Sequence, residues 1–368
     1  MAKKKSSSGL MLPKFWNQNS VKAILGMVAA GSFAFAFGQE KIQQFVSTAT
    51  VSNSACLDQF YREVPPYLVK QSLEKNNYPL CFNGFNVMYS GVSKTPLWVA
   101  EALTPARLSQ KIPREDSFHE ENRVPREHRA VLQDYRASGY DRGHMAPNAD
   151  MPTKAAQFDS FSLANMVPQA PKNNQQIWRE LEEATRAIVT KQKQDVYVVT
   201  GPVYAGKKLK TIGNGVIVPT ATYKAVYMPK TGTIGAYLAP NDNSLRVEVV
   251  SVCYLEEQLG INLFPQLTEE QKRNTYKLPL KAGAVKANVQ FAYSHWDAES
   301  QCAEDVEASQ LNALQSQFSS SGASLSSSAD SSNSNSHTGS PDQGGDVQDA
   351  MIKQLIEALL QFILQLLK

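Results

Sequence analysis

The chain has 368 residues, with 37 lysines and arginines against 34 aspartates and glutamates, which gives a formal net charge of +3. This length allows one large domain with appended segments, and a charge this weak does not by itself indicate a nucleic-acid-binding protein. The sequence contains no recognition-helix, RNA-binding or zinc-finger signature, and its four cysteines form no CxxC pair, so a zinc site is not expected.

The first 38 residues are predicted to direct the chain to a membrane. Three lysines at positions 3–5 and Lys22 precede an apolar or small-residue run from Ala23 to Gly38. A basic start before a short apolar run is typical of an export signal or an anchor. We therefore expect export to a periplasmic, membrane-anchored or secreted location, with membrane association at 22–38. A mitochondrial transit peptide is the alternative, although this segment contains no arginine.

Residues 56–300 are predicted to form the folded domain. Five segments have the composition of strands: Phe85–Gly91, Leu97–Ala102, Val196–Thr200, Tyr223–Met228 and Ile234–Leu238. They do not alternate regularly with helices, which favours an α+β fold with a central, largely antiparallel sheet and helices. Four cysteines permit three pairings, and we predict Cys56–Cys81 and Cys253–Cys302.

The run Asp141–Pro147 carries the densest chemistry in the chain. Arg142 offers a rigid fork of donors for phosphate charge, and Gly143 tolerates a tight turn or a close approach of the backbone to a substrate. His144 titrates near neutrality and can take a proton from water. This residue set is suited to phosphodiester hydrolysis. An ordinary turn with a solvated arginine is the alternative.

A helix is predicted over residues 174–191, where Ile177, Trp178, Leu181, Ala184, Ile188 and Val189 recur at helical spacing. Asn174 and Glu182 lie slightly more than two turns apart and can project on the same side. Their oxygens are ligands that magnesium prefers. The alternatives are a helix cap for Asn174 and a solvated surface position for Glu182. Trp178 falls on the apolar stripe, so we expect it in the core rather than as a stacking platform.

The C-terminal part divides into two predicted segments. Residues 318–345 are dominated by serine, with asparagine, glycine and aspartate, and are predicted to be a flexible linker. Residues 346–368 are predicted to form an apolar amphipathic helix with one narrow polar stripe. Such a helix can self-associate into a homo-oligomer, dock on a partner protein or lie on a membrane.

Several motifs in order resemble those of the DNA/RNA non-specific endonucleases, the ββα-metal nucleases that include the endonuclease G type. The resemblance covers roughly residues 56–285. It rests on Tyr140–Pro147, Leu163–Gln169, Asn174–Trp178 with Leu181-Glu182, Val196–Tyr204 and Val218–Lys224.

The resemblance implies a central sheet that carries a ββα-metal finger, with DNA and RNA as substrates. It implies His144 as the general base that activates water, and Asn174 as the direct ligand of Mg²⁺, with Mn²⁺ as a substitute. Glu182 would hold a metal-bound water, and Asn165 would orient the loop near His144.

Phosphate would be braced by Arg142 and Arg114. The assignment of Arg114 has five rivals in the same stretch, namely Arg107, Arg123, Arg126, Arg129 and Arg136.

The expected function is therefore a magnesium-dependent, sugar-non-specific endonuclease that hydrolyses phosphodiester bonds of DNA and RNA. The alternative is a catalytically decayed nucleic-acid-binding module, tethered at a membrane or in an assembly. A phosphodiesterase acting on small nucleotides is a third interpretation. The presence of His144, Asn174, Glu182 and Arg142 together favours an enzyme.

Overall fold

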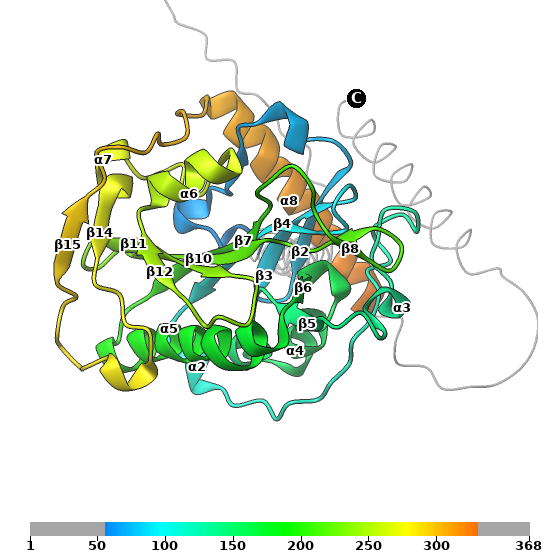
Figure 1. Cartoon of the computed structure of the whole chain (residues 1–368), viewed down its shortest axis with the longest axis horizontal. Coiled ribbons are helices and arrows are strands. Elements are labelled where there is room, and N and C mark those ends of the chain that lie inside the picture. Colours follow the sequence, from blue (N-terminus) through cyan, green and yellow to red (C-terminus); the bar gives the residue numbers. More distant parts are fainter. Residues whose placement is uncertain (1–55, 330–368) are drawn as a thin grey trace, which may run out of the picture. The chain divides into compact units, whose positions relative to one another are not determined.

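A seven-stranded antiparallel sheet forms the centre of the computed structural model, which describes residues 56–329 (Figure 1). The strand order is β12-β11-β10-β7-β4-β3-β2. The strands are β2 (Asn77–Phe82), β3 (Phe85–Ser90), β4 (Thr95–Leu103), β7 (Val196–Val203), β10 (Ala221–Met228), β11 (Thr233–Pro240) and β12 (Glu248–Val250). All five predicted strands lie in this sheet, so the α+β class with a largely antiparallel sheet is confirmed.

The middle strands of the sheet are buried on both faces. In β4 and β10 all but one residue of each strand is buried. Because both faces of these strands are covered, their sequences are mostly apolar and do not alternate between apolar and polar residues. One hydrophobic core lies on each face, and Trp178 and Trp98 belong to opposite cores. The sheet is therefore covered on both sides.

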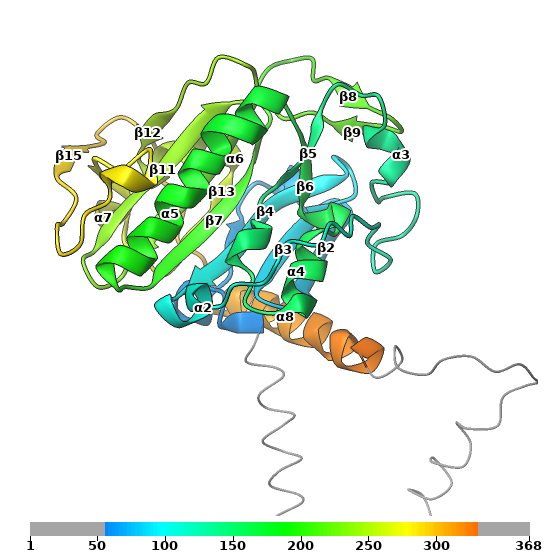
Figure 2. The same cartoon turned by 90° about the horizontal axis from the view of Figure 1, so that it is seen from below.

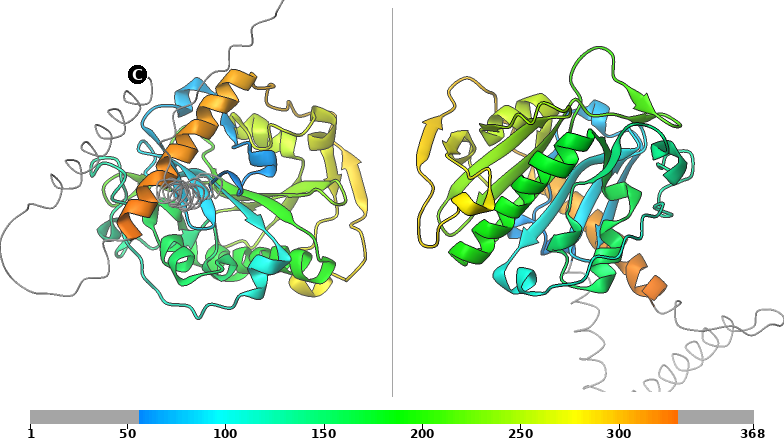
Figure 3. Two further views of the ribbon diagram at one scale, coloured as in Figure 1. Left: turned by 180° about the vertical axis from the view of Figure 1, so that it is seen from behind. Right: turned by 60° about the horizontal axis from the view of Figure 1, so that its bottom comes forward.

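Helices provide that cover. Helix α5 (Arg179–Gln192) crosses one face with α2 (Pro105–Ser109) and α4 (Lys154–Ser160) beside it, as Figure 2 shows. The other face carries α6 (Val252–Leu259) and α8 (Ala308–Ala329), which are seen together in the left panel of Figure 3. Two shorter helices, α3 (Leu132–Tyr135) and α7 (Glu269–Arg273), lie at the margins. Within residues 56–329 no helix has the length and apolar content that crossing a membrane requires.

Helix α8 corrects the start of the predicted linker. Residues 318–329, which were predicted to begin a flexible segment, belong to this helix. The reason is tertiary packing. Phe318 is fully buried, and its ring lies 5.3 Å from that of Phe60 and 5.5 Å from that of Trp98. The remaining linker residues, 330–345, lie outside the described residues, as do the segments 1–38 and 346–368.

A small hairpin and helix α5 form a ββα motif that packs against one face of the sheet. Strands β5 (Asp141–His144) and β6 (Met166–Gln169) pair antiparallel, with His144 opposite Met166, and the chain then enters a π-helical turn (Asn173–Trp178) that continues into α5. This arrangement is the ββα finger implied by the resemblance. Three further ribbons pair β1 (Tyr67–Leu68) with β13 (Ile261–Asn262), β8 (Thr211–Ile212) with β9 (Val216–Ile217), and β14 (Asn274–Tyr276) with β15 (Tyr293–Trp296).

Both predicted disulfides are present. Cys56–Cys81 joins the start of the described chain to β2, and Cys253–Cys302 joins α6 to the segment that precedes α8. Each closes a loop within the domain, and crosslinks of this kind restrict the unfolded chain.

Candidate active site

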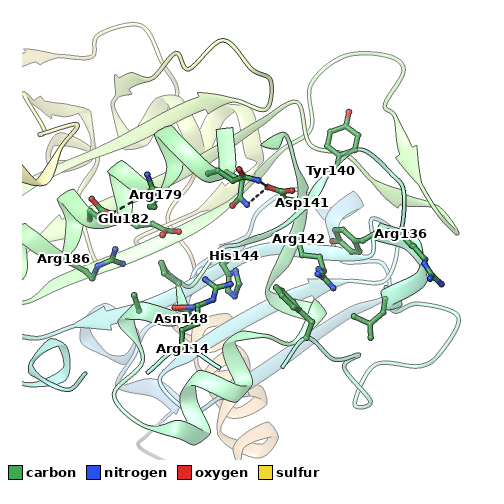
Figure 4. Close-up of a pocket in the computed structure, with 18 of the residues that line it drawn as sticks. Arg114, Arg136, Tyr140, Asp141, Arg142, His144, Asn148, Arg179, Glu182 and Arg186 are labelled. Atoms are coloured by element: carbon green, nitrogen blue, oxygen red, sulfur yellow. Dashed lines mark hydrogen bonds and ion pairs between the residues drawn. The ribbon is translucent and has the colours of Figure 1, made fainter. Parts of the chain in front are cut away.

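A cavity of about 950 Å³ opens where the finger meets α3 and the segment around residue 114 (Figure 4). Five of the six predicted site residues line it: Arg114, Arg142, His144, Asn174 and Glu182. The lining also holds Arg136, Arg179 and Arg186, so five arginines stand against the acids Asp141, Glu182 and Glu183. An excess of guanidinium groups suits a polyanionic ligand.

His144 ends strand β5, and aromatic side chains hold its ring. The ring centroid lies 5.0 Å from that of Phe161 and 5.8 Å from that of Phe118. Its Nε2 atom is buried and has no hydrogen-bond partner among the described residues. Burial, with Arg114 and Arg142 nearby, lowers the pKa of His144 to about 3. The imidazole is therefore neutral at physiological pH, as a proton acceptor must be.

Gly143 has a different role from the one the sequence suggested. It is not in a turn but within strand β5, opposite Val167. A Cβ atom placed on it would lie 2.0 Å from Oε1 of Gln169, a fully buried side chain on the neighbouring strand. The close approach that requires glycine is thus to the protein's own β6 and not to a substrate.

Asp141 and Asn174 are joined across the finger. The Asn174 amide nitrogen donates to the Asp141 carboxylate at 2.9 Å, and Gln175 donates to the same oxygen at 2.8 Å. Asn174 lies inside the π-helical turn, whose cap is Lys172, so the helix-cap alternative for Asn174 is wrong. Because Asp141 engages the amide nitrogen, the amide oxygen of Asn174 is the atom left for a ligand in the cavity.

Glu182 and Arg186 project from one side of α5, one turn apart. Burial raises the pKa of Glu182 to about 7, while Arg186 and Lys224 oppose the shift. Arg186 donates to Asp150 at 2.8 Å and lines the cavity. Sequence reasoning missed Arg186, although its i+4 spacing from Glu182 on a predicted helix was a usable signal.

The two predicted phosphate-bracing arginines both reach the cavity. The Arg142 guanidinium lies 3.8 Å from the centre of the Phe118 ring. Arg114 donates to Asp116 at 2.5 Å and also lies over Phe161.

Among the rivals of Arg114, only Arg136 also lines the cavity. Arg107 pairs with buried Glu101, and Arg123 and Arg129 pair with glutamates of their own segment.

Asn165 stands behind the cavity and does not line it. It is fully buried, and its amide oxygen accepts from Ala146 N–H at 2.9 Å. Its amide nitrogen donates to the carbonyls of Ala146 and Ser160 at 2.8 and 2.9 Å. These bonds hold the loop that follows His144, so Asn165 is a positioning residue.

A buried group of charges lies under the site. Lys224 on β10 is 1% exposed, donates to Thr200 at 3.0 Å and stands 5.6 Å from the Trp178 ring. Burial raises the pKa of Glu101 to about 8, against the opposing charges of Arg107 and Lys224. Trp178 is itself a core residue, as predicted, and its indole N–H donates to the His144 carbonyl at 3.3 Å.

The oxygens that the sequence motifs offer to a metal ion are the Asn174 amide oxygen and the Glu182 carboxylate, and both residues line the cavity. Among residues 56–329 no cluster of three or more His, Cys, Asp or Glu side chains could hold a metal. An amide and a carboxylate fit a hard divalent cation that keeps most of its water, as magnesium does.

Comparison with known proteins assigns the chain to a family. The DNA/RNA non-specific endonuclease family matches residues 66–270. The chain belongs to this family. Its members are metal-dependent nucleases, and membership makes the chain a hydrolytic endonuclease.

Individual relatives agree. Human mitochondrial endonuclease G is 35% identical over 217 residues, which cover 54% of this chain and 70% of the human protein. The mitochondrial nuclease EXOG of Danio rerio is 36% identical over 205 residues, covering 50% of this chain and 60% of that relative. A nuclease of Nostoc sp. is 33% identical over 214 residues, covering 53% of this chain and 76% of the Nostoc protein.

Proposed function

We propose that this chain cuts both DNA and RNA by metal-dependent hydrolysis, with His144 as the general base. The observation that carries the proposal is the neutral His144 ring, whose Nε2 has no partner among the described residues, in the same cavity as Asn174 and Glu182. An imidazole kept neutral by burial can accept a proton from an attacking water. The cavity is lined by five arginines and is therefore matched to a phosphate backbone, which carries no sequence information.

Each remaining residue has a supporting part. Arg142 and Arg114 brace the phosphate, because guanidinium groups match phosphate oxygens with paired donors. Asn174 would be the direct ligand of Mg²⁺, or of Mn²⁺ in its place, with Asp141 keeping the Asn174 amide in orientation. Glu182 would hold one of the metal-bound waters. When bound, such an ion supplies positive charge to the developing phosphorane and the leaving oxygen. Arg186, fixed by Asp150, adds a further cation at the Glu182 end.

The test is cleavage of closed circular DNA and of single-stranded RNA by the purified full chain, with magnesium and with EDTA. His144→Ala should abolish both reactions and leave the fold intact. His295→Ala is the matched control, since His295 is exposed on β15 and outside the cavity. Full activity of His144→Ala would refute the assignment. Binding without cleavage by the unmodified chain would favour the decayed, nucleic-acid-binding alternative.

We also propose that residues 1–38 direct export across a membrane. Two disulfides support an oxidising compartment. The names of the human and zebrafish relatives place those proteins in mitochondria, so mitochondrial import is the alternative. Cell fractionation of the full chain and of a form lacking residues 1–38 decides between them: recovery in mitochondria would refute export.

The segment 346–368 is proposed to join copies of the chain or to bind a partner protein or a membrane. The support is its apolar composition with a single polar stripe. Deleting it should change the mass of the protein in solution or its retention on membranes. If neither changes, the proposal fails.

A further inference from the structure

Arg136 lines the catalytic cavity but has no part in the proposed hydrolysis. Figure 4 draws it at the opposite end of the cavity from Glu182, with Arg142 between them. Three of the five lining arginines have a carboxylate partner: Arg114, Arg179 and Arg186. Within the described part of the chain, the Arg136 guanidinium has no such partner. Its charge is therefore not compensated by an ion pair, and the exposed side chain lies at the outer end of the cavity (Figure 4).

The backbone that carries Arg136 is held firmly, while the residue itself is exposed. Asp134, two residues earlier, is 4% exposed. Its carboxylate accepts from Val131 N–H at 2.8 Å and from Asn214 N–H at 2.7 Å, which ties α3 to the β8–β9 hairpin. Tyr135 is buried beneath the same turn. The backbone at Arg136 is therefore fixed beside the cavity, while its guanidinium has no ion-pair partner among the described residues and is available to an anion.

We propose that Arg136 binds a second backbone phosphate of the strand being cut, beside the phosphate held at Arg142 and His144. This inference rests on the proposed nuclease function. The ligand is a polynucleotide strand, because a strand carries successive phosphates that can meet Arg142 and Arg136 together. Exposed Leu132 and half-buried Tyr140, which line the same end of the cavity, offer apolar contact to the nucleoside between the two phosphates.

A specificity follows from this second contact. A substrate whose only phosphate is one phosphodiester, such as a dinucleoside monophosphate, reaches Arg142 but leaves Arg136 without a phosphate. An arginine–phosphate contact is a charge-assisted bond and contributes about tenfold or more to binding. The enzyme should therefore prefer polynucleotides to small nucleotides, which separates the nuclease from the phosphodiesterase interpretation.

The test uses short single-stranded DNA oligonucleotides with one ordinary phosphodiester, the other linkages being charged, slowly cleaved phosphorothioates. One phosphorothioate at a time is replaced by a neutral methylphosphonate, and KM and kcat are measured with the full chain in magnesium. For the unmodified chain, one position within about three linkages of the cut should raise KM about tenfold. For Arg136→Ala, KM for the fully charged oligonucleotide should rise by a similar factor. Placing the methylphosphonate at that position should then cause no further rise in KM.

Two further variants guard the interpretation. Arg246→Ala removes the same charge from a loop outside the cavity, where the side chain is 67% exposed, and should behave like the unmodified chain. Arg136→Lys keeps the charge without the planar fork. The KM of this variant should therefore still depend on the position of the methylphosphonate. If Arg136→Ala unfolds at a lower temperature than the unmodified chain, Arg136→Lys is the variant used for the test.

If Arg136→Ala and the unmodified chain respond alike at every position, the inference is overturned while the nuclease function stands. If the unmodified chain cuts none of the oligonucleotides, the proposed function is refuted, and the inference falls with it.

Discussion

The substitution Asn165→Asp tests how the loop after His144 is held. The replacement is nearly isosteric, but it exchanges the amide nitrogen for an oxygen. That nitrogen donates to the carbonyls of Ala146 and Ser160, and the side chain is fully buried. An ionised carboxylate at this position would lie against two carbonyl oxygens, and it has no hydrogen to donate to either of them. We therefore expect the introduced carboxyl group to remain protonated in the folded state.

The cost can be worked out from this requirement. Keeping a carboxyl of ordinary pKa about 3.9 protonated costs about 4 kcal/mol at pH 7 and about 1.5 kcal/mol at pH 5. The protonated group can donate to only one of the two carbonyl oxygens. The other carbonyl stays without a donor, which lowers the free energy of unfolding by about 1 to 3 kcal/mol at both pH values. The folded-state pKa is raised, so stability is kept at low pH and lost as pH rises through the window between the two pKa values. The destabilisation should thus shrink by about 2.7 kcal/mol from pH 7 to pH 5.

The assay is urea unfolding at both pH values, with the disulfides intact and with the unmodified chain measured alongside. Asn165→Ala is the matched control, because it removes the same hydrogen bonds without adding a titratable group. Its destabilisation should not depend on pH in this way. A loss for Asn165→Asp that is equal at pH 7 and pH 5 would refute the reasoning.

Three further predictions follow from the structure. Gly143→Ala should lower the free energy of unfolding by about 1 to 3 kcal/mol, because the added Cβ atom meets buried Gln169. Gly283→Ala is the control, since its Cβ atom would lie in open space, and it should unfold at nearly the same temperature as the unmodified chain. Equal unfolding temperatures for the two variants would contradict this account. Phe318→Ala should cost about 3 to 5 kcal/mol of unfolding free energy, since the side chain is fully buried, and a urea midpoint near that of the unmodified chain would mean that α8 is not part of the core. The pKa of His144 is near 6.5 in the unfolded chain and about 3 in the folded chain, so the free energy of unfolding should fall as the pH is lowered across that window. His144→Ala should lessen this fall. If the variant and the unmodified chain show the same pH profile of the urea midpoint, the folded protein does not hold the histidine neutral.

Local sequence patterns were enough to predict the sheet and the main helix. The five predicted strands and the helix over 174–191 are all present, because apolar spacing records which faces of an element are buried. The motif residues His144, Asn174 and Glu182 also meet in one cavity. They were identified from the motifs that resemble the nuclease family. They meet in the structure because the hairpin β5–β6 and the helix after it bring together segments that lie close along the chain.

Other features depend on contacts between distant segments. Arg136 could not be distinguished from the other arginines of the sequence, since an arginine outside a predicted helix gives no periodic signal and its position relative to a cavity is set by several elements at once. Arg186 differs, because its spacing from Glu182 on the predicted helix placed both residues on one side. The predicted start of the linker failed for a related reason. A serine-rich stretch does not indicate order by composition, yet Phe318 packs against both Phe60 and Trp98, which are far away in sequence.

By itself, therefore, the sequence determined the fold class and the residue types of the proposed catalytic group, because these follow from apolar spacing and from a motif. The two disulfide pairings were one choice among the three that four cysteines permit, and the structure contains them. The tertiary structure decided what each group faces: Asn165 bonds a loop from behind the cavity, Gly143 packs against Gln169, and Arg136 remains free at the rim. Those outcomes depend on strand register and helix packing, in which a shift of a single residue would turn a side chain to the opposite face.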